Sequence, residues 1–468
     1  MTRPGDQAVA RFPVRMTGPQ RGALASLSLA QFTTTIEFTI VFIALPSLGR
    51  DLGLAPALLA WVAGTYAVAF GGFLVLGGRL ADRFGARRLF LVAATAFTVG
   101  SVLGAVAATG PVLLGARGLQ GLAAALLQPA ILGLMQAVFP DEPVRGRAWG
   151  VWAGVGAAGL GIGALLGGLL TALSWRWTFA INVPLLAVCT VGALAWIRTD
   201  PASASPVRIP VTSAALGTGT ALSAALALTL AGEVGWISPA PWAALAVAVV
   251  LALGFGRHER GAARALIDPA LRRVTSLWLG AGVTALYMAS VGSAYYLLTL
   301  LLQDQWGYTA LRAGLGFLPL AVLVILGSAC APALIRRLGP GPLLGAGFGC
   351  AAAGLGWIAV TLNSGSYPLV LVGLLLSGLG NGMVFTAMFD LGTRDVPPAL
   401  HGTAGGILVT AQYLTSTLAL ALAALLLGPI PTPTTFQHAF LALTAAALTG
   451  AGLVLTPHRR RERPGPTR

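Results

Sequence analysis

The chain has 468 residues, of which 56% are hydrophobic and only 9% are charged. Soluble globular domains carry about 25% charged residues, so this composition excludes a water-soluble protein, and it is far too apolar for a disordered one. Helices of about 20 apolar residues, which cross a bilayer, account for the excess. The sequence therefore predicts an all-α polytopic membrane protein.

Fourteen apolar runs are long enough to be spans. In chain order they are 22–48, 57–79, 88–108, 110–137, 148–172, 177–197, 211–232, 239–256, 276–303, 311–335, 340–362, 367–390, 402–428 and 434–456. A twelve-helix protein would carry a polar central loop, but residues 199–275 hold two apolar runs around a turn-like segment at 232–239. Fourteen spans are therefore favoured over twelve.

All 29 basic residues are arginine, and they stand at the ends of the apolar runs. Twenty-five fall on one side of the predicted membrane, three fall on the other (Arg50, Arg176 and Arg312), and Arg117 lies within a span. Positively charged loops stay in the cytoplasm, so both termini are predicted to be cytoplasmic. Because the arginines form no basic domain, a nucleic-acid partner is excluded despite the net charge of +15.

These spans divide the chain into five parts. They are a cytoplasmic tail (1–21), an N-terminal six-helix bundle (22–198), two inserted helices with their linkers (199–275), a C-terminal six-helix bundle (276–456) and a basic cytoplasmic tail (457–468).

The loop between the second and third runs reads GRLADRFGARR over residues 78–88. Its glycines allow a tight turn, and its acid can pair with an arginine while accepting hydrogen bonds at a helix N-terminus. This loop resembles the signature of the major facilitator superfamily. The resemblance implies a conformational latch that breaks during alternating access and does not bind substrate. The latch residues are Gly78, Asp82, Arg83, Gly85, Arg87 and Arg88.

Arg117 lies within the fourth run, where a guanidinium is costly unless it is paired or hydrated. Gln120 follows one turn later, and Gln128, eleven residues on, falls on nearly the same helix face as Arg117. The run resembles the helix-4 motif of proton-driven major facilitator exporters. The alternative is a structural arginine that bridges helices.

The first run contains Glu37, the only acidic residue well inside a span. Counted at 1.5 Å per residue, Glu37 and Arg117 lie about 16 Å and about 10 Å below the outer membrane surface, so the two can meet or share water. The run resembles the helix-1 motif of the fourteen-helix drug–proton antiporters, with Glu37 in place of the usual Asp and Phe42 in place of Asn. The alternative is a carboxylate that serves only as the counter-ion of Arg117.

The fifth run has small residues about every four positions, which allow close helix contact. They are Gly159, Gly163, Gly167 and Gly168, and the stretch Trp175, Arg176, Trp177, Phe179, Asn182 and Pro184 follows them. Together they resemble the antiporter signature of the drug–proton exporters, although Ala164 stands where that family usually has proline.

The C-terminal half matches more weakly. Residues 332–340 resemble a degenerate second copy of the latch loop, and residues 378–405 resemble the helix-12 to helix-13 stretch of the same exporters. Tyr287, Tyr295 and Tyr296 are candidates for a drug cavity, with core or lipid-facing positions as alternatives. The complete set of cavity candidates is Phe38, Phe42, Gln120, Gln128, Tyr287, Tyr295, Tyr296 and Asn381.

The resemblance implies a major facilitator fold and export of lipophilic or cationic drugs across a bacterial plasma membrane. Glu37, with Arg117 beside it, would carry the proton, since burial and the nearby positive charge act on its protonation in opposite directions. The implied partners are a small-molecule substrate, protons and membrane lipids, with no obligate protein partner. The alternative on the same fold is a narrow-specificity metabolite exporter or a solute–proton symporter.

An enzyme is not expected. The four histidines are scattered and show neither triad nor metal spacing, and the three cysteines lie singly within apolar runs. No phosphate-binding loop of the Walker type occurs, so the predicted energy source is the proton-motive force, without a metal or cofactor.

Overall fold

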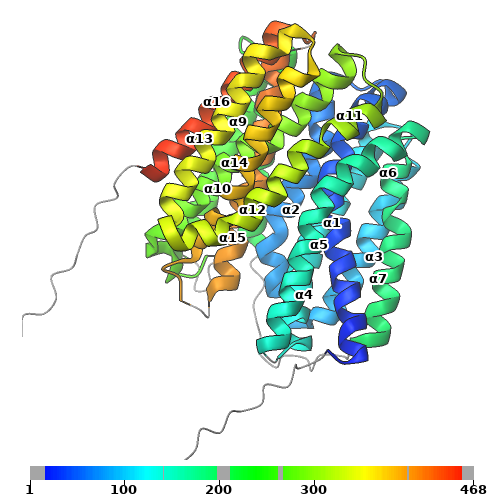
Figure 1. Cartoon of the computed structure of the whole chain (residues 1–468), viewed down its shortest axis with the longest axis vertical. Helices are drawn as coiled ribbons and strands as arrows, with labels where there is room; N and C mark the ends of the chain where they lie inside the picture. The colour runs from blue at the N-terminus through cyan, green and yellow to red at the C-terminus, as the bar shows by residue number, and fades with distance from the viewer. Residues whose placement is uncertain are drawn as a thin grey trace, which may run out of the picture.

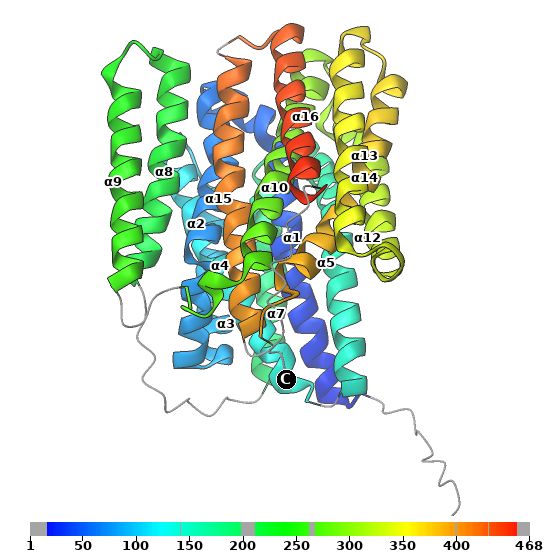
Figure 2. The same cartoon turned by 90° about the vertical axis from the view of Figure 1, so that its left-hand side faces the viewer.

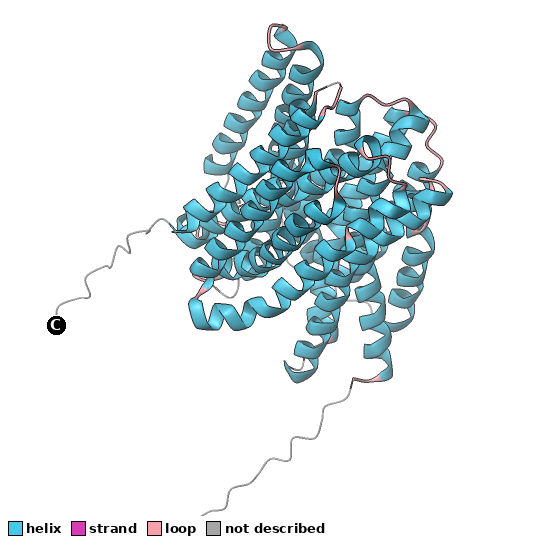
Figure 3. Ribbon diagram, turned by 45° about the horizontal axis from the view of Figure 1, so that its top comes forward, coloured by secondary structure: helices cyan, strands magenta, loops and turns pink. Residues whose placement is uncertain are grey.

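The computed structural model describes residues 16–140, 142–197, 211–261, 267–397, 400–428 and 430–455. Every regular element in this part of the chain is helical, and the helices run side by side in one bundle (Figures 1 and 3). Of the predicted N-terminal tail (1–21), residues 1–15 lie outside the described residues and residues 18–21 belong to the first helix; the predicted C-terminal tail (457–468) lies outside them entirely. The structure therefore confirms an all-α bundle of the kind that the composition predicts.

The first part of the bundle contains α1 (Gly18–Leu52), α2 (Pro56–Phe84), α3 (Ala86–Ala105), α4 (Gly110–Val138), α5 (Glu142–Leu173), α6 (Trp177–Ala180) and α7 (Asn182–Trp196). A hairpin follows, made of α8 (Val211–Val234) and α9 (Pro239–Gly261). The last part contains α10 (Thr275–Leu300), α11 (Ala310–Gly316), α12 (Leu318–Leu338), α13 (Pro340–Thr361), α14 (Tyr367–Thr393), α15 (His401–Leu427) and α16 (Pro433–Leu455). Short turns η1 (Leu271–Arg273), η2 (Leu301–Gln305) and η3 (Leu362–Ser364) flank α10 and α13.

Each of the fourteen predicted spans falls on a helix. Thirteen helical segments within the described residues are long and apolar enough to cross a membrane. The remaining span corresponds to α5, a helix of 32 residues.

Two spans are broken where the sequence predicted continuous helices. The sixth span is interrupted at Ile181, between α6 and α7, and the tenth span is interrupted at Phe317, between α11 and α12. A proline follows each break, Pro184 in α7 and Pro319 in α12, and its missing N–H removes one backbone hydrogen bond to the preceding turn. A third irregularity is η2, a π-turn that ends α10.

The helices pack as two groups with a hairpin beside them. Helices α1 to α7 pack mainly against one another, and α10 to α16 do the same, so the bundle has an N-terminal half and a C-terminal half (Figure 1). The halves meet along α2 with α15 and along α5 with α11. The α8–α9 hairpin lies at the edge of the bundle, where α8 packs against both α2 and α15 (Figure 2).

The helix α1 begins at one end of the bundle, which we call the terminal face (Figure 2). The loop between α2 and α3 lies on this face. The end of α1, the start of α6 and the turn η2 lie together at the other end, which we call the opposite face, since Asp51 accepts from Trp175 and Arg176, and Arg50 pairs with Asp304.

Candidate functional site

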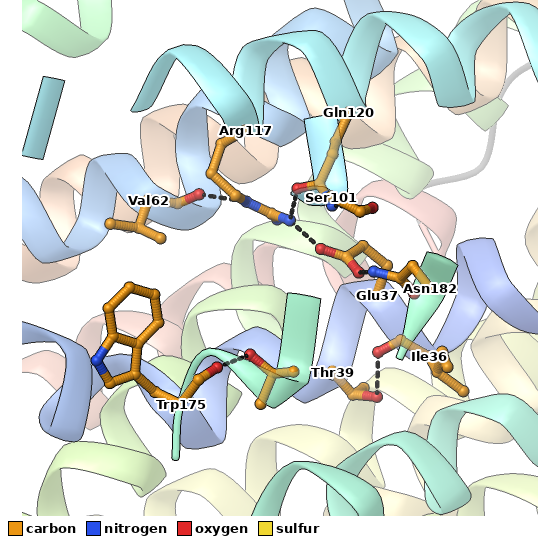
Figure 4. A network of polar contacts seen from close by, with 10 residues as sticks. Ile36, Glu37, Thr39, Val62, Ser101, Arg117, Gln120, Trp175 and Asn182 are labelled. Carbon is orange, nitrogen blue, oxygen red and sulfur yellow. Dashed lines mark hydrogen bonds and ion pairs between the residues drawn. The ribbon is translucent and has the colours of Figure 1, made fainter. Parts of the chain in front are cut away.

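The centre of the N-terminal half contains a buried ion pair between Glu37 of α1 and Arg117 of α4 (Figure 4). Their side chains are 0% and 1% exposed. A buried charge is costly unless a partner and further hydrogen bonds satisfy it. The two residues that the sequence singled out as functional are therefore each other's partner.

The guanidinium of Arg117 is satisfied on several sides. Its Nε donates to the carbonyl oxygen of Val62 at 2.9 Å, and its Nη1 donates to Oε1 of Gln120 at 2.9 Å. Gln120 in turn donates to Ser101 of α3 at 3.0 Å. The ring of Tyr66 lies 4.5 Å from the guanidinium carbon, close enough for a cation–π contact. Arg117 thus joins α1, α2 and α4 and is held in one position.

Glu37 has a second partner, from the broken sixth span. Nδ2 of Asn182, at the start of α7, donates to Oε2 of Glu37 at 2.6 Å (Figure 4). Arg117 contacts the other carboxylate oxygen, Oε1. Both oxygens of the carboxylate therefore face hydrogen-bond donors, an arrangement that suits its charged form.

A small cleft lies against this ion pair, between the two halves. Its free volume is about 10 Å³, and it is lined by Phe38, Phe42, Ala63, Tyr66, Ala67, Arg117, Ser416 and Leu420. Drug-sized ligands occupy pockets of roughly 300–1,000 Å³, so the cleft has to widen before it admits one. Arg117 is among the residues that line the cleft, whereas Glu37 is not.

Aromatic rings from both halves surround the cleft. Phe38 packs edge-on against Phe42 and Tyr413, with ring centroids 5.6 and 6.2 Å apart. Phe42 stacks on Tyr295 of α10 at 6.3 Å, and Tyr295 stacks on Phe317 at 5.3 Å. Such rings offer flat apolar walls that suit a lipophilic or cationic aromatic compound.

The residues that line this cleft do not include the predicted cavity candidates Tyr287, Tyr296, Asn381 and Gln128. Tyr287 packs against Phe385 at 6.0 Å, and Tyr296 is fully buried in the core. Asn381 is buried on α14, and Gln128 is half-buried on α4; neither is among the residues that line the cleft. Gln120, which the sequence places one turn from Arg117, accepts a hydrogen bond from its guanidinium.

The predicted glycines of α5 allow it to approach two other helices closely. Gly159, Gly163 and Gly167 face α1: a methyl group on Gly167 would lie 2.9 Å from the carbonyl oxygen of Ile40. Gly168 faces α11 in the other half, where a methyl group would lie 2.8 Å from the carbonyl oxygen of Ala310. One glycine stripe thus serves packing within the N-terminal half and contact between the halves.

The latch residues lie where α2 turns into α3. Gly85 joins the two helices with φ 88°, a conformation that favours glycine, whereas Gly78 lies inside α2 and makes no turn. Arg87 donates to the carbonyl oxygen of Leu194 at 3.4 Å. Asp82 is exposed in the last turn of α2, and within the described residues it has no hydrogen bond or ion pair. The hydrogen bonds and the arginine pair predicted for Asp82 are therefore not formed among the described residues.

Polar contacts join the halves near the opposite face. Arg50 of α1 pairs with Asp304 of η2 at 3.2 Å, and Gln303 donates to the carbonyl oxygen of Ile43 at 2.9 Å. Nearer the middle of the bundle, Thr417 of α15 donates to the carbonyl oxygen of Gly64 at 3.1 Å. The halves are thus held together at this face in the state that the structure represents.

We expect replacement of Arg50 by Gln to lower the free energy of unfolding by no more than about 1 kcal/mol. The Arg50 and Asp304 side chains are 66% and 39% exposed, so water competes for both charges. Thermal unfolding of the detergent-solubilised protein measures the change, and added salt should reduce it. A loss as large as that for a buried ion pair would contradict this interpretation.

Sequence reasoning missed several members of the site. Asn182 was noted only as part of a motif, although a buried amide in an apolar span is itself a signal of a polar partner. Tyr66, Ser101 and Ser416 gave no such signal, because aromatic and hydroxyl residues are common throughout the spans.

A bundle of two helical halves around a buried ion pair and a small aromatic cleft defines a multi-pass membrane transporter. The family model of the Major Facilitator Superfamily matches residues 27–420. The chain belongs to this superfamily, which confirms the family predicted from the loop and helix motifs.

Bacterial relatives cover most of the chain. The puromycin resistance protein pur8 of Streptomyces alboniger is 34% identical over 85% of this chain and 80% of its own length. The cephamycin export protein CmcT of Amycolatopsis lactamdurans is 34% identical over 85% and 83%. The multidrug resistance protein Stp of Mycobacterium tuberculosis is 30% identical over 87% and 75%.

Solved structures agree on the fold. The POT family transporter PepTSo superposes with a TM-score of 0.69 over 94% of this chain and 97% of its own, at 20% identity. The human organic anion transporter MFSD10 superposes with a TM-score of 0.64 over 94% of this chain and 100% of its own, at 15% identity. These likenesses confirm the predicted major facilitator fold.

Proposed function

We propose that this chain exports lipophilic or cationic small molecules from a bacterial cell in exchange for protons. The terminal face would be cytoplasmic, as the arginine distribution indicates. One observation carries the proposal: Arg117 belongs both to a buried ion pair with Glu37 and to the wall of the cleft between the halves. The related proteins named for export or resistance support the direction of transport.

The ion pair provides a way for proton and substrate to exclude each other. While Glu37 is charged, it compensates Arg117, and the cleft is close to neutral. A proton on Glu37 removes this compensation and leaves a positive guanidinium on the cleft wall. That charge repels a cationic substrate, and a released Arg117 side chain competes with any substrate for a cleft this small.

The proton gradient supplies enough energy for such exchange. Each inward proton yields about 2.3 kcal/mol per 100 mV of membrane potential. This corresponds to roughly a fifty-fold gradient of substrate per proton. Rocking of the two halves around the central cleft would expose it to each side in turn.

Export of one metabolite is the second candidate. The relatives include a protein named for export of a single compound, cephamycin. The tightly packed cleft, in which Phe42 fills space between Phe38 and Tyr295, fits a narrow substrate range.

The test uses inside-out membrane vesicles with an imposed pH gradient. We expect ethidium to collapse the gradient in vesicles containing the wild-type protein and to leave it intact with Glu37→Gln, which cannot release a proton. Glu37→Asp keeps a carboxyl group and should retain exchange. Unchanged collapse with Glu37→Gln would exclude Glu37 as the proton carrier. No collapse with any of a series of lipophilic cations, from protein shown to be in the membrane, would favour the narrow exporter.

A further inference from the structure

The partner of Glu37 on α7 has an unused hydrogen-bonding atom. Asn182 is 0% exposed and donates through Nδ2 to Glu37 at 2.6 Å, while its own Oδ1 is buried with no hydrogen-bond partner. A buried acceptor without a donor costs about 1–3 kcal/mol. The position of this amide therefore calls for an explanation beyond the contact that it makes.

The two protonation states of a carboxyl group need different partners. A carboxylate only accepts hydrogen bonds, whereas the protonated acid has an O–H that must donate one. Arg117 has five N–H donors and no acceptor, so it satisfies only the charged form. An asparagine amide has both a donor (Nδ2) and an acceptor (Oδ1), and a half-turn about its Cβ–Cγ bond exchanges their positions.

Among the described residues, the side chains that hydrogen-bond to the Glu37 carboxylate are those of Arg117 and Asn182, and of these two only the amide can both donate and accept. The charged and titratable groups that face Glu37 are Arg117 from α4 and Tyr66 from α2, whose ring packs on the guanidinium. α5 packs against this stretch of α1 with its glycine face, at Gly163 and Gly167. α10 contributes Tyr295, which stacks on Phe42, more than one turn along α1.

We propose that Asn182 is the positioning residue that accommodates both protonation states of Glu37, through a half-turn of its amide group. In the charged state Nδ2 donates to Oε2, as observed. When a proton from solvent binds Oε2, the new O–H donates to Oδ1 of Asn182, and Nδ2 turns away to the side that Oδ1 occupied. One O–H bond forms on Oε2 as one O–H bond breaks in the hydronium ion that delivers the proton, which leaves water.

This inference rests on the proposed role of Glu37 as the proton carrier and adds the means by which a closed site tolerates both forms. Without such a partner, the protonated acid would face the N–H groups of Asn182 and Arg117 with its own O–H unsatisfied. With such a partner, the carboxyl group remains in place while its charge changes. What changes at the cleft is whether the positive charge of Arg117 is compensated.

The test is infrared difference spectroscopy of the protein in lipid membranes, between alkaline and acidic buffer. We expect the wild-type spectrum to show a protonated-carboxyl band that Glu37→Gln lacks, together with a side-chain amide change that disappears in Asn182→Leu. In Asn182→Leu the carboxyl band should move to the frequency of an acid that donates no hydrogen bond. Ethidium-triggered proton exchange should fall by about ten- to hundred-fold, the equivalent of one charge-assisted hydrogen bond.

Asn182→Ser serves as the matched variant, because a hydroxyl both donates and accepts, and it should retain more exchange than Asn182→Leu. A wild-type spectrum without an amide change, or a carboxyl band that Asn182→Leu leaves in place, would overturn the role of Asn182. A carboxyl band that persists in Glu37→Gln would instead overturn the role of Glu37 itself. The two failures are thus distinguishable.

Discussion

Replacing Arg117 with Met is expected to lower the free energy of unfolding by about 3–5 kcal/mol, the cost of leaving one member of a buried ion pair alone. The variant removes the counter-ion of a carboxylate that is 0% exposed. It also removes the donors to Val62 and Gln120, and with them a link between α2 and α4. Thermal and denaturant unfolding of the purified protein measure the loss.

A second variant separates the charge from the packing. Glu37→Gln combined with Arg117→Met leaves no unpaired charge, and we expect it to recover much of the stability that Arg117→Met loses. The cycle of the two single variants and the double variant gives the interaction energy of the pair. Additive losses would show that Glu37 and Arg117 do not interact in the folded protein.

Replacing Gly168 with Val is expected to abolish transport while leaving the folded protein intact. A side chain at this position meets the backbone of α11, at Ala310 and Leu311, across the contact between the halves. Because neither backbone can yield within its own helix, the halves cannot close at the opposite face. A cysteine placed beside the cleft should then react with a membrane-impermeant reagent added from that side.

The same helix offers a matched control for this variant. A methyl group on Gly154 meets no atom within 4 Å, so Gly154→Val should transport like the wild type. Gly163→Val, which meets Ile36 and Thr39 of α1 in the same half, should destabilise the protein and not arrest it. Normal transport by Gly168→Val would show that the contact between α5 and α11 does not need to close.

The sequence predicted the spans well because length and apolarity define a membrane helix. It also predicted the pairing of Glu37 with Arg117, since one acid and one base inside the membrane have few alternatives to each other. The second prediction depends on the cost of burying charge, which acts wherever the residue lies in the fold.

Other parts of the site were not predictable in this way. In a membrane helix both the lipid-facing and the core-facing sides are apolar, so periodicity does not tell which side faces the cleft. Tyr295 lines up with Phe42 while the adjacent Tyr296 points into the core, and nothing in their sequence distinguishes them. The break at Ile181, which brings Asn182 to Glu37, depends on tertiary packing as well as on Pro184.

The α8–α9 hairpin is tied to both halves, at opposite ends. Trp61 of α2 donates to Thr229 near the end of α8 at 2.8 Å. At the terminal face, Glu259 of α9 accepts from Ser213 of α8 at 2.7 Å and pairs with Arg272 of η1, just before α10, at 3.6 Å. The hairpin therefore has polar contacts with both of the bodies whose relative motion would constitute transport.

Such a double attachment restricts the freedom of the bundle. If α2 and α15 tilt against each other, α8 cannot follow both, and either the Trp61–Thr229 bond or the packing of α8 on α15 has to slip. The inserted helices thus affect the free-energy difference between the conformations of the transport cycle and the barrier that separates them. Their effect is not limited to enlarging the surface that faces lipid. Neither α8 nor α9 contributes a residue to the cleft lining. Through its packing on α2 and α15 the hairpin nevertheless affects the timing of the transport cycle.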